Sequence, residues 1–257
     1  MQQVCYYQAL EDVYERFCEK LGKTEPESTP YDAKSHDYFV FHAPYNKLVQ
    51  KSYGRLFFLD ARRRQQQRNG EDAIEEEGFE SEWLTKPLEE TYADKLLEKA
   101  CKQVSKISYE QRLKDANKAS QLVGNTYTAS VFFGLASLID RAGGRGDLTP
   151  GKSIAVFSYG SGALATMYRL TVREPLDSSR FSVEKMAGAL KLMDRLESRE
   201  KVHPNELDQY VKNLKSIYCY TFMSLTSSTF CLQKCPGNSC PHAPSRSSIF
   251  PCVPNRW

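Results

Sequence analysis

The sequence predicts an α/β fold, because short strand-like runs alternate with longer segments of helical periodicity. Residues 38–41 (YFVF) and 154–158 (IAVFS) are short apolar runs bounded by polar or glycine residues, as buried strands are. Around them, apolar residues recur at spacings of three and four, which indicates helices with one buried face. A chain of 257 residues with 40% apolar residues can bury a core. Strands alternating with helices are typical of layered α/β proteins.

The first part of the chain is predicted to run helix, loop, strand, helix. Apolar residues at three- and four-residue spacing predict a helix over 2–21, and Pro26 and Pro30 mark a polar loop. The strand at 38–41 ends in His42-Ala43-Pro44-Tyr45. A helix is expected from 46 to about 60, since a proline is well tolerated where a helix starts.

Residues 61–90 change character twice. Three arginines, Arg62, Arg63 and Arg64, precede three glutamines, and residues 71–90 are strongly acidic. We predict a solvated surface insertion without a function of its own, in which Trp83 and Leu84 can anchor the segment to the core.

The second half is predicted to contain helices over 92–105, 128–141 and 182–197, the second of them fully buried. The strand at 154–158 leads into a Gly160-Ser161-Gly162 turn. We place one domain over 1–213. The remainder, 214–257, is rich in Cys, Ser and Pro and has no Asp or Glu. It is predicted to be a disordered or non-native tail, outside the domain.

The bulk properties disfavour several classes of protein. A net charge of +3 and a pI near 8.3 are too mild to indicate binding to nucleic acid or to an anionic membrane. No apolar run approaches the ~20 residues that span a bilayer, and the start has neither signal-peptide nor transit-peptide character. Cys5, Cys18 and Cys101 are expected to act as small hydrophobes in a reduced, cytoplasmic protein, with mitochondria as the alternative compartment.

Two short motifs suggest sites that we disfavour. Gly146 to Ser153 fits the phosphate-loop pattern G-x-x-x-x-G-K-S, but a helix precedes it and a strand follows it, the reverse of the order that the mechanism needs. We predict a connector there instead. A second set of residues could supply four zinc ligands, but their spacing fits no common zinc module, so no metal site is predicted: Cys231, Cys235, Cys240 and His242.

Three segments carry a family resemblance: FHAPYNKLVQKS (41–52), VGNTYTASVFFGLAS (123–137) and VFSYGSG (156–162). Weaker similarity appears in VCYYQAL (4–10), LEETYADKLLEKA (88–100) and RLESREKVHPNE (195–206). In this order, over about residues 3–213, they resemble the hydroxymethylglutaryl-CoA synthase family of the thiolase superfamily. The resemblance implies the C-terminal half of a thiolase-like layered fold.

The resemblance also implies a set of site residues. His42, at the end of a buried strand, and Asn125 are implied to be the catalytic donors that stabilise negative charge on a substrate oxygen. Ser161 and Tyr159 are expected to bind substrate. Lys47 and Lys51 are implied to contact the CoA moiety, and with Arg55 they recur every four residues as a cationic stripe on one helix face.

The implied reaction condenses acetyl-CoA with acetoacetyl-CoA to give hydroxymethylglutaryl-CoA and CoA. These thioesters are substrates, so no cofactor is expected, and the family implies a homodimer without nucleic-acid or membrane partners. The family's nucleophilic cysteine and its glutamate acid/base lie in the N-terminal half, which this chain is expected to lack, so the chain alone is expected to be inactive. The alternative is a non-catalytic remnant that binds CoA or a partner protein.

Without the other half of a thiolase arrangement, apolar surface should be exposed. The sequence offers five candidates for that surface: Phe41, Val131, Phe132, Leu135 and Val156.

Overall fold

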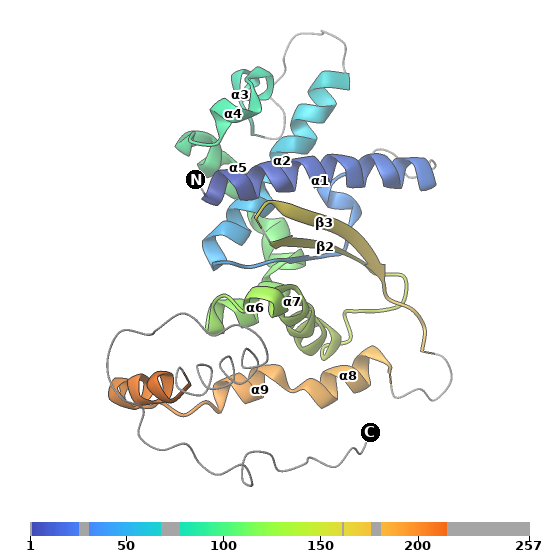
Figure 1. Ribbon diagram of the computed structural model, residues 1–257. Helices are drawn as coiled ribbons and strands as arrows, with labels where there is room; N and C mark the ends of the chain where they lie inside the picture. The colour runs from blue at the N-terminus through green and yellow to red at the C-terminus, as the bar shows by residue number, and fades with distance from the viewer. Residues whose placement is uncertain (1, 26–30, 68–77, 161, 176–180, 215–257) are drawn as a thin grey trace, which may run out of the picture. The chain divides into compact units, whose positions relative to one another are not determined.

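The computed structural model describes residues 2–25, 31–67, 78–160, 162–175 and 181–214 (Figure 1). The chain divides into two compact units, residues 1–199 and 200–257. In the second unit, the described residues form a helix over 204–214. The fold described below is that of the first unit.

In its described residues, the first unit is predominantly helical and has one small sheet. Its strands are β1 (Tyr38–Phe41), β2 (Ser153–Gly160) and β3 (Leu164–Thr171). Its α-helices are α1 (Gln2–Thr24), α2 (Asn46–Gln67), α3 (Ser81–Thr85), α4 (Leu88–Thr91), α5 (Lys95–Arg112), α6 (Lys114–Val123), α7 (Ser130–Leu138), α8 (Val183–Leu190) and α9 (Leu192–Glu197). No helix in the described part of the chain is both long and apolar enough to cross a membrane.

The sheet has the order β1-β2-β3. β1 pairs with β2 in parallel, with Phe41 opposite Phe157, and β2 and β3 form an antiparallel hairpin. Both predicted strands are confirmed. β3 was not predicted, because it is mostly half-exposed and lacks the continuous buried run that identified the other two strands.

Helices cover both faces of the sheet, giving a layered α/β arrangement. In Figure 1, α1 lies along one side of the sheet, and α6 and α7 lie along the other. Side chains alternate across β1: Phe39 and Phe41 pack edge-on against Tyr53 of α2, whereas Val40 points toward Gly134 of α7. The core is therefore strongly aromatic on the α1–α2 side of the sheet.

The helical predictions are confirmed in kind, with different ends. The helix predicted over 128–141 is not fully buried as predicted, since Phe132 is 69% exposed. The helix predicted over 182–197 is two helices, α8 and α9, because Lys191 adopts a left-handed conformation with φ 40°. The Asp140 carboxylate caps the start of α9, since Oδ1 accepts a hydrogen bond from the N–H of Leu192 at 2.7 Å and Oδ2 from Met193 at 3.2 Å. A tertiary contact thus interrupts a segment whose own pattern is continuously helical.

The predicted surface insertion over 61–90 differs from the structure at both of its ends. Residues 61–67 continue α2, because Ala, Arg and Gln are good helix formers. Phe79, Trp83 and Leu84 are buried, so the predicted anchor is confirmed and residues 78–90 cover part of the core. The acidic residues between them, 68–77, lie outside the described residues.

The connector prediction for Gly146 to Ser153 is confirmed. A π-helical turn, Ile139–Gly143, precedes it, and β2 begins at Ser153. Lys152, which would hold phosphate in a nucleotide site, instead forms an ion pair with Asp37 at 2.8 Å. No helix N-terminus follows this loop to face a phosphate group, and the nucleotide-binding interpretation is excluded on geometry.

The predicted apolar surface is only partly present. Phe41, Val131 and Val156 are buried by the chain's own helices, so that part of the prediction is wrong. Phe132 is 69% exposed and keeps its predicted place on the surface, and Leu135 is half-buried. The reason is that α1, α2 and α7 already cover both faces of the sheet.

The packing of α2 on α5 gives a testable stability prediction. A Cβ on Gly54 would lie 2.8 Å from the backbone oxygen of Cys101, so the substitution Gly54→Ala must push the two helices apart. We expect it to lower the free energy of unfolding by about 1–3 kcal/mol. Urea unfolding followed by circular dichroism measures the change.

Gly22→Ala is the matched control. Gly22 lies inside α1 and a Cβ there would meet nothing within 4 Å, so this change should raise stability by roughly 0.5–1 kcal/mol. If the two variants are equally stable, α2 and α5 do not approach each other as described.

Candidate active site

His42 lies directly after the carboxyl end of β1. Its backbone N–H donates a hydrogen bond to the carbonyl oxygen of Phe157 at 2.8 Å, which extends the parallel ladder by one residue. Because parallel strands end at the same edge of a sheet, β2 brings Tyr159 and Gly160 to the same place. The strand ends therefore position the candidate site.

A pocket of about 300 Å³ opens beside His42. Three parts of the chain line it: His42, which directly follows β1, the residues around the start of α7, and the β2–β3 hairpin. These residues are His42, Tyr127, Thr128, Val131, Ser158, Tyr159, Gly160, Leu164, Ala165 and Thr166. Burial lowers the pKa of His42 below its usual value, so the imidazole is neutral near pH 7 and one ring N–H can donate a hydrogen bond.

Asn125 belongs to the loop between α6 and α7, and it is not among the described residues that line this pocket. Its Oδ1 accepts a hydrogen bond from the N–H of Tyr127 at 2.7 Å, which leaves the side-chain NH₂ group as the free donor. Tyr127 has a left-handed conformation with φ 51°, an arrangement uncommon outside glycine. The loop thus brings Tyr127 and Thr128, rather than Asn125, to the pocket beside His42.

Tyr159 faces His42, with ring centroids 6.3 Å apart. Its hydroxyl donates to the carbonyl oxygen of Gly162 at 2.8 Å, which holds the ring against the turn of the β2–β3 hairpin. Ser161, the other predicted substrate-binding residue of this turn, lies outside the described residues.

The side chains of the predicted cationic stripe become more buried from the start of α2 onward. Lys47, in the first turn, is exposed, and Lys51 forms an ion pair with Glu98 of α5 at 2.8 Å. Arg55 is only 4% exposed and pairs with Glu11 of α1 at 2.6 Å, so including it in the cationic stripe was wrong. The buried partner on α1 makes this position part of the core.

Two of the described cysteines, Cys18 and Cys101, are not activated thiols. Burial raises the pKa of Cys18 to about 11 and that of Cys101 to about 12, so both stay protonated at neutral pH. Cys5 is half-buried and lines a different cavity from His42. The tail cysteines considered and rejected as zinc ligands lie outside the described residues, within which no cluster of three metal-binding side chains is found.

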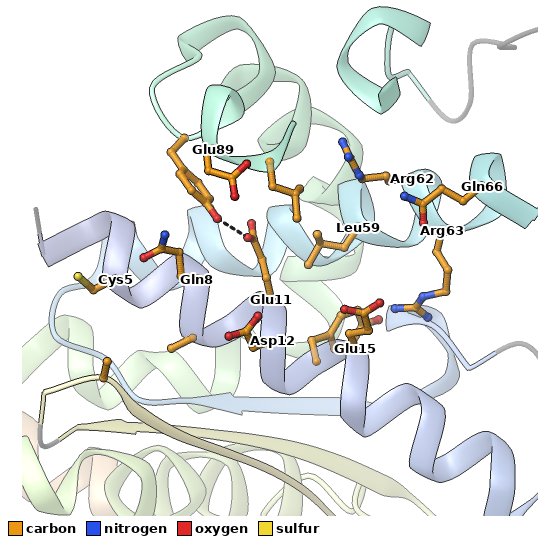
Figure 2. Close-up of a pocket in the computed structure, with 15 residues that line it drawn as sticks. Cys5, Gln8, Glu11, Asp12, Glu15, Leu59, Arg62, Arg63, Gln66 and Glu89 are labelled. Atoms are coloured by element: carbon orange, nitrogen blue, oxygen red, sulfur yellow. Dashed lines mark hydrogen bonds between the residues drawn. The ribbon is translucent and has the colours of Figure 1, made fainter. Parts of the chain in front are cut away.

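That second cavity, of about 470 Å³, lies between α1, α2 and α4 (Figure 2). α1 lines it with Gln8, Asp12 and Glu15, and α2 lines it with Arg62 and Arg63. None of the residues predicted for the site lines it, although it is the larger of the two cavities. Of the predicted site residues, His42 and Tyr159 line the smaller pocket at the strand ends.

Sequence reasoning did not single out Tyr6, Thr128 or Ser130, although all three lie inside segments quoted for the resemblance. Thr128 lines the pocket, whereas Tyr6 and Ser130 contact the backbone beside His42. The sequence offered one indication of these residues, their position within VCYYQAL and VGNTYTASVFFGLAS. Their contacts depend on tertiary packing, which no local sequence pattern reveals.

Comparison with solved structures defines the class of fold. MvaS in complex with 3-hydroxy-3-methylglutaryl coenzyme A matches 82% of this chain and 43% of that chain, with a TM-score of 0.56 and 23% sequence identity. This likeness shows a shared fold, and the prediction of a thiolase-like layered α/β fold is confirmed.

Sequence comparison defines the family. The profile described as "Hydroxymethylglutaryl-coenzyme A synthase C terminal" matches residues 1–234, and the chain belongs to this family. The match continues past residue 213, where the sequence analysis ended the domain.

Curated proteins of similar sequence are named as members of the same family. Hydroxymethylglutaryl-CoA synthase A of Dictyostelium discoideum is 34% identical over 78% of this chain and 38% of its own length. The cytoplasmic hydroxymethylglutaryl-CoA synthase of Homo sapiens is 35% identical over 82% of this chain and 39% of its own length. The chain thus spans about two fifths of the curated relatives that it matches.

Proposed function

We propose that this chain provides the acetoacetyl-CoA side of a hydroxymethylglutaryl-CoA synthase active site. The observation that carries the proposal is a neutral His42 at the joined ends of β1 and β2, facing a pocket of about 300 Å³ in a member of this family. An imidazole N–H there suits a carbonyl oxygen that gains negative charge during the reaction.

In the proposed reaction, a cysteine thiolate takes the acetyl group from acetyl-CoA and releases CoA. The acetyl methyl group then loses a proton, and the resulting carbanion attacks the ketone carbon of acetoacetyl-CoA. The former ketone oxygen becomes an alkoxide and takes up a proton, and water cleaves the thioester to free hydroxymethylglutaryl-CoA and the thiol. His42 donates a hydrogen bond to the oxygen that becomes the alkoxide, and Asn125 and Ser161 are proposed as further polar groups for the same substrate.

The nucleophile in this proposal is a cysteine of the family's N-terminal half and not one of the cysteines of this chain. The high pKa values of Cys18 and Cys101 support this assignment, and Cys5 lines a different cavity from His42. CoA thioesters are substrates here, so the proposal includes no cofactor. A cytoplasmic location and a homodimer are proposed with it, the location because the human relative is named as cytoplasmic.

The test combines this chain with a separately produced N-terminal portion of the human relative. We expect no transfer of radioactive acetyl groups from acetyl-CoA to this chain alone. With both pieces present, acetyl transfer to the N-terminal portion and formation of hydroxymethylglutaryl-CoA should be detected by mass spectrometry. Labelling of this chain alone would place the nucleophile within it, against the proposal. Binding of acetoacetyl-CoA without product formation would favour the non-catalytic alternative.

The proposed CoA contacts give a separate prediction. Replacing Lys47 and Lys51 together by Ala should weaken acetoacetyl-CoA binding by about tenfold or more, since a charged hydrogen bond contributes ~1.5–3 kcal/mol. Isothermal titration calorimetry of the full chain measures the dissociation constant. Lys114→Ala is the matched control, because Lys114 is an exposed lysine paired with Glu110 of α5. An equal loss of acetoacetyl-CoA affinity in the control would show that the two α2 lysines have no specific role in binding.

A further inference from the structure

The peptide bond between His42 and Ala43 is held at both of its polar atoms. The hydroxyl of Tyr6 donates a hydrogen bond to the carbonyl oxygen of His42 at 2.8 Å. The N–H of Ala43 donates to Oγ of Ser130, also at 2.8 Å. Because a peptide group is planar, two bonds on its opposite sides fix its rotation about the chain.

This clamp lies where the sheet no longer supports the backbone. β1 ends at Phe41, and the last hydrogen bond of the ladder is the one from the N–H of His42 to Phe157. Tyr6 and Ser130 are each only 1% exposed, so water has little access to replace either bond. Burial raises the pKa of Tyr6 well above its usual value, which keeps its hydroxyl protonated as the donor.

The two clamp residues also connect the parts of the site. Tyr6 comes from α1, and its ring packs against Tyr159 with centroids 4.9 Å apart and against Phe157 with centroids 5.3 Å apart. Ser130 is the first residue of α7, directly after the loop that contains Asn125 and Thr128. A shift of either residue would therefore move His42 relative to the pocket wall that faces it.

We propose that Tyr6 and Ser130 are positioning residues for His42, which fix the direction of its side chain by clamping the following peptide bond. This inference rests on the proposed function for its catalytic consequence, but the clamp itself acts on His42 whether or not the chain takes part in catalysis. Neither residue contacts the reacting atoms in this scheme.

The test compares Tyr6→Phe and Ser130→Ala with two variants that lose a buried hydroxyl elsewhere. Tyr53→Phe removes a hydroxyl that contacts Oγ of Ser108, and Ser137→Ala removes one that bonds to the backbone of α6 from the same helix as Ser130. All four keep most of their side-chain volume. Thermal unfolding of each full-length variant measures its stability. A change in the position of His42 can then be distinguished from a general loss of stability.

The first readout is the imidazole of His42 in nuclear magnetic resonance spectra, assigned with His42→Asn. In the two clamp variants the ring should become less buried, so its pKa should rise toward the ordinary value of about 6.5 and its signals should shift and broaden. The two controls should leave both properties unchanged. This readout does not depend on catalysis.

The second readout is hydroxymethylglutaryl-CoA formation in the two-piece assay. Each clamp variant should lower kcat by about tenfold or more and leave KM for acetoacetyl-CoA nearly unchanged, since small misplacements of a catalytic group are costly. An unchanged His42 signal in both clamp variants would overturn the proposal. So would equal shifts in the controls. A changed signal with no activity in the unmodified pair would support the clamp and count against the proposed function instead.

Discussion

Replacing His42 by Ala should lower the rate of hydroxymethylglutaryl-CoA formation in the two-piece assay by about 10²–10³-fold, the usual cost of removing one donor to a developing oxyanion. His42 is half-buried, neutral near pH 7 and beside a pocket large enough for the acyl end of a thioester. The effect should fall on kcat, because the hydrogen bond strengthens as charge builds on the oxygen.

His203→Ala is the matched control for this prediction. His203 is exposed, and its Nδ1 accepts a hydrogen bond from the N–H of Asn205 two residues later. Its removal should leave the rate within about twofold of the unmodified chain, since substitutions of exposed side chains usually have small effects. Acetyl transfer to the N-terminal portion should persist in both variants. If the His42→Ala chain kept the full rate of condensation, His42 would not be a catalytic residue.

Arg55→Met should lower the free energy of unfolding by about 3–5 kcal/mol, because it leaves a buried carboxylate without its counter-charge. Arg55 donates from Nε to Glu11 at 2.6 Å and from Nη2 to Thr91 at 2.6 Å. The hydroxyl of Tyr92 donates to the second oxygen of Glu11 at 2.7 Å. The guanidinium also lies over the aromatic rings of three residues, with 5.0–5.6 Å to the ring centroids: Tyr7, Phe58 and Tyr92.

The pH dependence of this loss has a definite sign. Burial raises the pKa of Glu11, and Arg55 opposes that rise, so Arg55→Met should raise the pKa of Glu11 further. The folded variant then binds the Glu11 proton more tightly than the unfolded chain does, and its stability falls as pH rises. Urea unfolding at about pH 5 and about pH 8 should therefore show the smaller loss at the lower pH. The double variant Arg55→Met/Glu11→Leu should regain part of the stability at both, because no unpaired charge remains buried.

The sequence alone predicted the elements whose signal is local. Residues 38–41 and 153–160 form strands because their apolar runs are buried on both faces, and His42 could be placed at a strand end by its position after YFVF. The family motifs then supplied roles for Lys47, Lys51, Asn125, Tyr159 and Ser161 that no periodicity could supply.

The features that escaped prediction depend on partners far along the chain. Arg55 is buried because Glu11 and Thr91 meet it, and the break between α8 and α9 depends on Asp140. The positions of Tyr6 and Ser130 likewise follow from the packing of α1 and α7 around the end of β1. Each of these residues is ordinary for its own segment, so only the tertiary structure identifies it.

The parallel pairing of β1 with β2 has a consequence for how the chain folds during synthesis. Asp37 and Ser153, which join the starts of these strands, are 116 residues apart, whereas β3 follows β2 after a short turn. At about 5–20 residues per second, a ribosome adds β2 roughly 6–25 seconds after β1. Throughout that interval β1 lacks β2, the strand with which it pairs in the described sheet. Chaperones that hold extended apolar segments can bind the nascent chain at YFVF during this interval, and the β2–β3 hairpin can form only after that period ends.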